Sequence, residues 1–280
     1  MSNVEIYYFS GTGNSLYVAK ELQKRIPETN IIPIVSLLNE DVIETNGETV
    51  GFVFPIYATM IPVPVKNFLK KLDLKSTKYI FAIATRAGSQ HRAFIDIEKI
   101  LKKRGRSPDS YFTLNMGANY LNPNPTEEEI AELEPVVQDR LASIQQSIIN
   151  KEKNKEKDTH ITTPLPFAFV LLRLYPLLMV FAEHAGLKHN FYSDSKCTGC
   201  GTCEKVCLSQ KIKMVDKKPV WQENVRCYMC YACINYCPAQ SIQFRSMWYM
   251  KVDTTKLGRY SHPYATAEDI AGEKEHKELS

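Results

Sequence analysis

The chain contains 280 residues, carries a formal net charge of +4 and is 44% hydrophobic. This length exceeds the usual size of a single compact core, so we expect one medium domain and one small domain. The weak charge and ordinary apolar content disfavour nucleic-acid binding and a generally disordered chain. The N-terminus lacks a basic region followed by an apolar stretch and a cleavage site, so we expect no signal peptide and a reducing cytoplasmic location.

The first predicted strand covers residues 4–9 and leads into a loop rich in glycine and hydroxyl groups. A helical pattern follows, with apolar residues on one face at Leu16, Ala19, Leu22 and Ile26. Amide groups at the start of such a helix point toward an anion, and glycines allow a close backbone approach. The loop has no lysine or arginine, which suits a monophosphate held by neutral donors. Its residues are Ser10, Gly11, Thr12, Gly13, Asn14 and Ser15.

The spacing of this loop disagrees with two common phosphate-binding motifs. The dinucleotide fingerprint fails because Leu16 occupies its third glycine position. A Walker loop would need Gly-Lys-Ser/Thr, whereas Asn14 and Ser15 follow Gly13 here. The loop instead resembles the FMN phosphate loop of the flavodoxin family. A structural glycine turn without a ligand is the alternative.

Further strand-like runs cover residues 31–35, 50–54, 79–85 and 111–116, with amphipathic helical stretches over 65–72 and 94–101. This alternation predicts an α/β fold, a flavodoxin-like doubly wound five-stranded parallel sheet. A last helix is expected from the capping-box pattern at Thr126 to Ile148, with Pro135 as the site of a kink. This helix closes a predicted FMN-binding domain over residues 1–157.

In sheets of this kind the ligand lies beyond the carboxyl ends of the strands, at the switch point of the strand order. The resemblance therefore implies flavin contacts in the loops after the third, fourth and fifth strands. We expect Tyr57 to stack on the flavin, with a partly exposed loop tyrosine as the alternative. Arg86 would raise the flavin potential at the pyrimidine side, or else be a solvated surface residue. The implied contacts are Pro55, Ile56, Tyr57, Ala58, Thr85, Arg86, Ala87, Gly88, Ser89, Asn119 and Tyr120.

Residues 158–190 are expected to link the two domains, and they include an apolar run over 165–182. This run is long enough to span a membrane. However, Pro166 and Pro176 interrupt it, and Arg173 would cost about 2.5–3.5 kcal/mol at the centre of an inserted helix. We therefore expect a linker helix packed between the domains and no transmembrane span. An interfacial membrane helix or a helix that docks a partner is the alternative.

All eight cysteines of the chain lie in two runs with the spacing C-x2-C-x2-C-x3-C, and the second run repeats the first after 30 residues. Three cysteines spaced by three residues can face three corners of one iron-sulfur cube. Zinc sites favour two separate C-x-x-C pairs, and disulfides need an oxidising compartment. Neither alternative explains the triplet spacing, so we predict two iron-sulfur clusters.

The region over 191–246 resembles a bacterial two-cluster ferredoxin, in which the fourth cysteine of each run binds the cluster of the other run. Pro238 supplies the proline that normally follows the closing cysteine, but Leu208 stands in its place after the first run. This departure could loosen the turn and change solvent access to cluster two. The resemblance implies that Cys197, Cys200, Cys203 and Cys237 hold cluster one, and that Cys227, Cys230, Cys233 and Cys207 hold cluster two.

The last segment, residues 247–280, contains Trp248, Tyr249 and Tyr264, which we expect to pack back on the domains. Its charged end is expected to be disordered.

The whole arrangement resembles fused flavodoxin-ferredoxin proteins of anaerobes. This resemblance implies electron transfer between FMN and two 4Fe-4S clusters, as a carrier or two-to-one electron converter between low-potential redox proteins. One alternative is an FMN-dependent reductase of a quinone or enone, with Tyr57 or Tyr120 as proton donor; another is a redox-sensing regulatory subunit. Surface lysines of the ferredoxin part either steer an acidic partner or form an ordinary solvated face. Donor, acceptor, substrate turnover, peripheral membrane contact and oligomeric state stay open.

Overall fold

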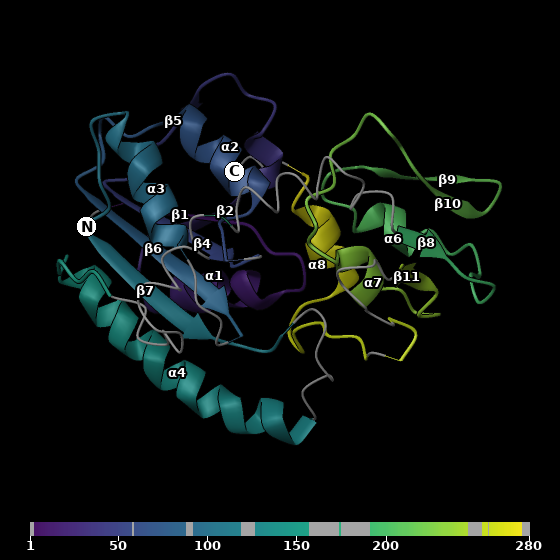
Figure 1. Ribbon diagram of the computed structural model, residues 1–280. Coiled ribbons are helices and arrows are strands. Elements are labelled where there is room, and N and C mark those ends of the chain that lie inside the picture. Colours follow the sequence, from purple (N-terminus) through teal and green to yellow (C-terminus); the bar gives the residue numbers. More distant parts are fainter. Residues whose placement is uncertain are drawn as a thin grey trace.

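The computed structural model describes residues 3–57, 59–87, 92–118, 127–156, 174, 191–245, 254–256 and 258–275. Figure 1 shows two parts, an α/β part built on one central sheet and a smaller part with short strands and helices. The C-terminal helix α8 (Ala267–Gly272) lies between them.

The central sheet is parallel and has the strand order β2-β1-β4-β6-β7. This is the flavodoxin-like order, and its switch point lies between β1 and β4. The prediction of a five-stranded doubly wound sheet is confirmed. A separate short parallel pair joins β3 (Ile43–Glu44) to β5 (Leu72–Asp73). The strands of the main sheet are β1 (Val4–Tyr8), β2 (Thr29–Pro33), β4 (Thr49–Pro55), β6 (Tyr79–Arg86) and β7 (Ser110–Asn115).

Helices cover both faces of this sheet. In Figure 1, α1 (Asn14–Arg25) and α4 (Glu127–Ile149) lie on one face, and α2 (Val63–Lys71) and α3 (Ala93–Lys102) lie on the other. A short 3-10 helix, η1 (Ile34–Leu37), packs beside α2. Because both faces are covered, every residue of β6 is buried, as expected for a central parallel strand. The predicted apolar face of α1 is buried at Leu16, Ala19, Leu22 and Ile26.

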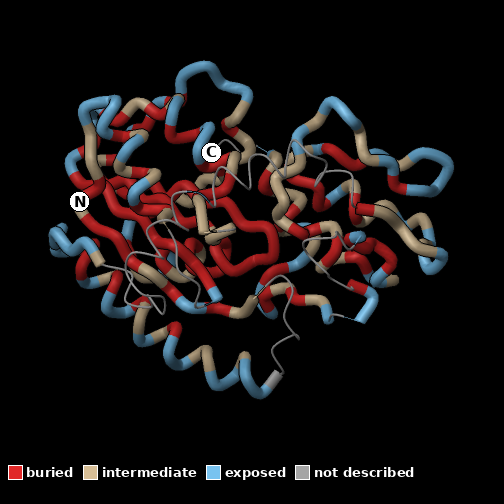
Figure 2. Tube along the Cα trace, viewed as in Figure 1, coloured by how far each residue is buried: buried red, intermediate tan, exposed pale blue. Residues whose placement is uncertain are grey.

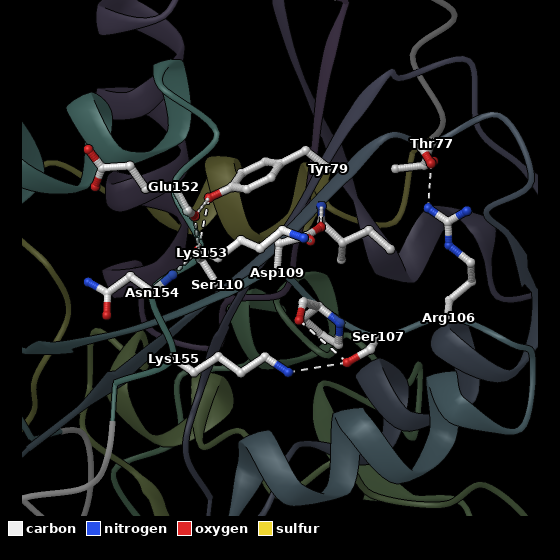
Figure 3. Close-up of polar contacts among 12 residues, drawn as sticks. Thr77, Tyr79, Arg106, Ser107, Asp109, Ser110, Glu152, Lys153, Asn154 and Lys155 are labelled. Atoms are coloured by element: carbon white, nitrogen blue, oxygen red, sulfur yellow. Dashed lines mark hydrogen bonds and ion pairs between the residues drawn. The ribbon is translucent and has the colours of Figure 1, made fainter.

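A polar network holds the segment after α4 against the starts of β6 and β7 (Figure 3). Tyr79 Oη lies 2.9 Å from Ser110 Oγ and 2.7 Å from the carbonyl oxygen of Glu152. The amide of Asn154 donates to Ser110 Oγ at 2.9 Å. These contacts lie at the amino ends of the strands, so they stabilise the edge of the sheet opposite the ligand-binding edge.

The smaller part is built from two similar halves, as the 30-residue repeat predicts. Helix α6 (Thr202–Lys205) in the first half corresponds to α7 (Ala232–Asn235) in the second. Each half repeats a turn in which the amide of a glutamine, Gln210 or Gln240, donates at 2.9 Å to the carbonyl oxygen of the closing cysteine of its run. The strands form two antiparallel pairs, β9 (Ile212–Val215) with β10 (Lys218–Trp221) and β8 (Phe191–Ser193) with β11 (Ile242–Phe244).

The C-terminal strap, residues 258–275, packs against both parts. It includes α8, whose first turn has a capping box between Thr266 and Asp269. The expectation of a disordered charged end is wrong for Glu273, because this side chain is fully buried. Tyr264 packs back as predicted, with its ring stacked 5.6 Å from that of Tyr17. The predicted packing of Trp248 and Tyr249 lies outside the described residues.

Within the part of the chain that the structure describes, no helix is both long and apolar enough to cross a bilayer. The predicted linker helix over 165–182 lies outside the described residues, apart from the exposed Leu174. The boundaries 1–157, 158–190, 191–246 and 247–280 therefore stay predictions.

Candidate functional site

Residues 10–15, which form the loop after β1 and the first two positions of α1, are all buried (Figure 2). Gly13 has φ 99°, a left-handed conformation that favours glycine, and it directly precedes α1. The amide of Gly13 donates to Ser10 Oγ at 3.0 Å, so the loop folds back on its own first residue. This geometry turns the end of β1 directly into the first turn of α1.

Several backbone amides of this loop remain available for an anion. Among the described residues, the amides of Gly11, Thr12, Asn14 and Ser15 donate no hydrogen bond. The first turn of α1 also lacks an acidic residue and a side-chain cap. Buried donors at the positive end of a helix fit the phosphate of FMN, because anionic oxygens would satisfy them.

The side chains of the loop are tied to neighbouring strand ends. Asn14 Nδ2 donates to the carbonyl oxygen of Gly117 at 2.9 Å. Ser15 Oγ lies 2.9 Å from Thr85 Oγ1, at the carboxyl end of β6. These two bonds tie the loop to the carboxyl end of β6 and to the segment that follows β7. They also engage two side chains that the sequence suggested as phosphate donors.

The loops predicted to surround the flavin are described only in part. The amide of Ile56 donates to the carbonyl oxygen of Thr85 at 2.9 Å, which joins two of these loops. Arg86 is buried, and its Nε donates to Asn115 Oδ1 at 3.0 Å, so the solvated-surface interpretation is wrong. Pro55 is half-buried and Ala87 is exposed. The predicted contacts Ala58, Gly88, Ser89, Asn119 and Tyr120 lie outside the described residues.

Tyr57 lies at the junction between the loop and the ferredoxin part. Its ring meets the ring of Phe9 edge-on at 6.2 Å. A Cβ atom added at Gly11 would lie 2.6 Å from the hydroxyl of Tyr57. The hydroxyl therefore points at the loop after β1. Stacking of Tyr57 on a flavin stays a prediction.

The structure brings the first three cysteines of the first run together with the last cysteine of the second. Burial, and then the charges of the three neighbouring thiolates, raise the pKa of Cys203 to about 11. Hydrogen bonding to Thr202 lowers the pKa of the exposed Cys200. One cavity is lined by all four, Cys197, Cys200, Cys203 and Cys237, together with Met214 and Ser241 among others.

The other four cysteines form a second group. Burial raises the pKa of Cys230 well above its usual range, and the charges of Cys227 and Cys207 raise it further. Burial raises the pKa of Cys233 well above its usual range, and the charges of Cys207 and Cys227 raise it further. Cys207 thus lies with the second run and Cys237 with the first, which is the crossed grouping that the ferredoxin resemblance implies.

This arrangement fits two iron-sulfur cubes. A cube takes one thiolate at each of its four irons, so its sulfur ligands surround a space and do not meet at one point. Among the described residues, no three His, Cys, Asp or Glu side chains converge on a site for a single metal ion. Backbone amides donate to two of the sulfurs, from Ser241 to Cys237 at 3.3 Å and from Met229 to Cys227 at 3.4 Å.

The second cysteine group lies directly against the loop after β1. A Cβ atom added at Gly11 would lie 2.5 Å from the carbonyl oxygen and 2.8 Å from the Cβ of Cys230. The rings of Phe9 and Tyr228 also meet, at 6.2 Å. The predicted site for cluster two is therefore next to the predicted phosphate site of the flavin.

Leu208 stands where a two-cluster ferredoxin normally has proline, and it has a structural role that the sequence did not suggest. It is buried in the same hydrophobic core as β1 and α1, together with Val206 and Ala232. The turn after Cys207 keeps the hydrogen bond that its counterpart after Cys237 makes. The leucine therefore joins the two parts, and the expectation of a loosened turn is not met.

The C-terminal strap contributes residues to this site that the sequence analysis missed. Tyr260 Oη donates to Asn14 Oδ1 at 2.8 Å, and the amide of Tyr260 donates to Asn235 Oδ1 at 2.9 Å. The amide of His262 donates to the carbonyl oxygen of Thr12 at 2.8 Å. One segment thus holds the loop after β1 and the helix α7 of the ferredoxin part at once.

Two titratable groups of the strap are buried against this loop. The amide of Ser10 donates to Glu273 Oε2 at 3.1 Å, while no described donor reaches Glu273 Oε1. Burial raises the pKa of Glu273 well above its usual range. His262 stacks on Tyr17 at 4.2 Å, and burial lowers its pKa to about 4. The only sequence signals for this segment are the closely spaced aromatic residues from Tyr260 to Tyr264 and the capping box that follows them.

Comparison with known proteins identifies the smaller part. Residues 196–242 match the family of 4Fe-4S dicluster domains. This match assigns two 4Fe-4S clusters to the cysteine-rich part, and the prediction of a flavodoxin-like sheet followed by a two-cluster ferredoxin domain is confirmed. A protein with these two parts transfers electrons. No curated protein sequence is significantly similar to the chain.

Solved structures with similar folds include several flavoproteins. A flavodoxin from Streptococcus pneumonia TIGR4 is 16% identical, with a TM-score of 0.30, covering 51% of this chain and 99% of its own. An FMN-dependent NADH-azoreductase from Bacillus anthracis is 9% identical, with a TM-score of 0.35 and coverages of 54% and 99%. Rubredoxin oxygen:oxidoreductase from Desulfovibrio gigas is 12% identical, with a TM-score of 0.33 and coverages of 54% and 37%. At these scores the fold assignment rests on the strand order of the sheet itself.

Proposed function

We propose that this protein binds one FMN at the loop after β1 and exchanges electrons between that FMN and its two 4Fe-4S clusters. The observation that carries the proposal is the contact between Gly11 of this loop and Cys230 of the second cysteine group. FMN supplies two-electron chemistry, and each cluster supplies one-electron chemistry. The chain would therefore work as an electron carrier or two-to-one converter between low-potential redox proteins.

The proposed flavin site uses the residues of the loop in distinct ways. The amides of Gly11, Thr12, Asn14 and Ser15 would hold the phosphate. The side chains of Asn14 and Ser15 hold the loop in place through Gly117 and Thr85. The strap covers this loop, since a Cβ atom added at Gly13 would lie 2.4 Å from the Cβ of Ala265. This cover keeps water away from the donors and strengthens their interaction with an anion.

The cysteine groups suggest an order for the two clusters. Cluster two, with Cys227, Cys230, Cys233 and Cys207 as proposed ligands, would be proximal to the flavin. Cluster one, with Cys197, Cys200, Cys203 and Cys237, would be distal. Because Cys200 is exposed, cluster one is the natural place for exchange with another protein.

The reductase alternative needs a proton donor beside the flavin. One of its two candidates, Tyr57, directs its hydroxyl toward Gly11 of the phosphate loop. The other, Tyr120, lies outside the described residues. Electron exchange between the cofactors is therefore the function that the described contacts favour.

Quantification of cofactors tests the proposal. The full chain, reconstituted without oxygen, is expected to hold about eight irons and one FMN, as two cubes and one flavin require. Stepwise reduction should then change the flavin and cluster absorbances together. Four irons or fewer, or the absence of bound flavin, would rule the proposal out.

A further inference from the structure

The hairpin of β9 and β10 presents an outward face without a described covering. Its register pairs Lys213 with Val220 and Val215 with Lys218. We call these four side chains the outer hairpin face. All four are exposed, and Val215 and Val220 keep 51% and 46% of their surface in solvent. Because side chains alternate along a strand, the opposite face is formed by Ile212, Met214, Pro219 and Trp221, which are buried or half-buried.

This hairpin lies directly over the first cysteine group. Met214, on its inner face, lines the same cavity as Cys197 and Cys200. Lys217, in the turn, packs on the loop between these cysteines, since a Cβ atom added at Gly199 would lie 2.8 Å from the Cβ of Lys217. A protein that covers the outer hairpin face and the turn would therefore lie next to the exposed Cys200.

The charge around this surface is positive. Four exposed lysines lie on the hairpin, in its turn or in the loop that begins the first cysteine run, at Lys213, Lys218, Lys217 and Lys196. Three acidic residues accompany them: Asp216 in the turn, Glu204, which pairs with Lys213 at 3.6 Å, and Asp194, which accepts a hydrogen bond from the amide of Lys196 at 2.9 Å. The four positive and three negative side chains leave an excess of one positive charge. Exposed lysines at the edge of such a surface attract an acidic protein.

We propose that the outer hairpin face, with its turn, docks an acidic electron-transfer protein that exchanges electrons with cluster one. This proposal rests on the proposed function and adds the partner class and its docking surface. Lysines at the edge would steer the encounter, and the two valines would provide an apolar centre. Small interfaces of this composition suit transient redox complexes. Figure 1 places the hairpin at the end of the molecule away from the central sheet, where a partner can approach.

The first test reverses charges in the full chain with its cofactors bound. We compare K217E/K218E with the control K99E/K103E, because Lys99 and Lys103 are exposed and lie on or next to α3 at the far end of the molecule. The probes are an acidic flavodoxin and a basic cytochrome c, mixed with the reduced protein in an oxygen-free stopped-flow instrument.

For the flavodoxin, we expect K217E/K218E to lower the second-order rate constant by about tenfold or more at low ionic strength. The difference should shrink at high salt, where charges are screened. For cytochrome c the rate should rise. Rates that stay unchanged, or that fall equally in K99E/K103E, would overturn the proposal.

The second test addresses the apolar centre with V215T/V220T, which keeps the branched shape of both side chains. At high ionic strength, we expect this variant to weaken flavodoxin binding several-fold while its thermal midpoint stays close to that of the wild type. Unchanged binding would show that the two valines do not contact the partner, and it would overturn their role in docking. In both tests, exchange between flavin and clusters within the chain should persist. Its absence from the wild type would contradict the proposed function and not the docking surface alone.

Discussion

Gly11 and Cys230 lie so close together that a single added carbon at Gly11 would clash with the backbone of Cys230. Gly11 belongs to the loop that the sequence assigns to the flavin phosphate, and Cys230 belongs to the second cysteine run. The two predicted cofactor sites therefore share a boundary made of backbone atoms. Glycine is required there because the two backbones approach closely. Its φ lies outside the left-handed region, so backbone conformation alone would not require glycine.

We predict that Gly11→Ala separates the two cofactor sites. The new methyl group would overpack the junction at a cost of about 1–3 kcal/mol. We expect slower electron exchange between flavin and clusters and weaker FMN binding. Flash reduction and flavin fluorescence titration would measure these effects. Gly272→Ala is the matched control, since a Cβ atom there meets nothing within 4 Å. Equal behaviour of the two variants would show that the contact has no role.

The hydroxyl of Tyr260 is predicted to support FMN binding by holding Asn14 in place. Tyr260→Phe removes one buried hydrogen bond, which is worth about 0.5–1.5 kcal/mol. We therefore expect the dissociation constant of FMN to rise by about two- to twelvefold, as measured by quenching of flavin fluorescence. Tyr264→Phe is the control, because the Tyr264 side chain is 64% exposed. No change in Tyr260→Phe, or an equal change in the control, would contradict this role.

Docking of the strap should weaken below neutral pH because of His262. Its pKa falls from 6.5 to about 4 in the folded protein. Between these values the unfolded chain binds more protons, so the free energy of unfolding decreases as the pH falls through this window. The free energy of unfolding decreases by up to about 1.4 kcal/mol for each pH unit in this window. Hydrogen exchange of the strap over about pH 4.5–8 would measure it, and His262→Phe should flatten the profile below about pH 6.5. A profile that stays the same in this variant would refute the assignment.

Glu273 should have the opposite effect. Burial raises its pKa, so above about pH 4.5 the folded protein binds more protons than the unfolded chain at this group. Its contribution to the free energy of unfolding therefore decreases as the pH rises. Glu273→Gln keeps an acceptor for the Ser10 amide but cannot lose a proton. We expect this variant to resist release of the strap at high pH better than the wild type, in the same hydrogen-exchange measurement. Weaker protection at every pH would show that the carboxyl group serves another purpose.

Two serines allow the clusters to be distinguished. Ser241 Oγ and Ser209 Oγ each lie 3.6 Å from a cysteine sulfur, of Cys237 and Cys207 respectively. Hydrogen bonds to sulfur stabilise the more negative, reduced cluster. Removing one should lower the potential by about 20–60 mV for a bond of 0.5–1.5 kcal/mol. We expect Ser241→Ala to shift cluster one and Ser209→Ala to shift cluster two, as followed by potentiometry with electron paramagnetic resonance. A shift of the same cluster in both variants would contradict the crossed grouping.

Most of the features that were predicted correctly from the sequence follow from regular patterns. The strand runs and the apolar face of α1 follow from periodicity, because buried faces repeat with the geometry of each element. The crossed cysteine groups follow from the 30-residue repeat and the ferredoxin resemblance. Arg86 could not be placed from sequence alone, because its burial depends on Asn115 from the next strand.

Apart from the packing of Tyr264, the contacts of the C-terminal strap could not be predicted, and the reason is physical. Tyr260, His262 and Glu273 act through contacts with residues about 250 positions earlier in the chain, as in the bond from the Ser10 amide to Glu273 across 263 positions. A charged residue near the end of a chain usually lies in solvent, so burial of Glu273 has no signal in its own sequence neighbourhood. Leu208 shows the same limit, because its partners lie in the other part of the molecule.

The most direct test of the central claim is the concentration dependence of electron exchange after flash reduction of the loaded protein. If the flavin and cluster two share the boundary at Gly11 and Cys230, the flavin and cluster absorbances should relax together with a first-order rate that does not depend on protein concentration. A rate proportional to protein concentration, or no exchange at all, would show that electrons do not pass between the two sites within one chain.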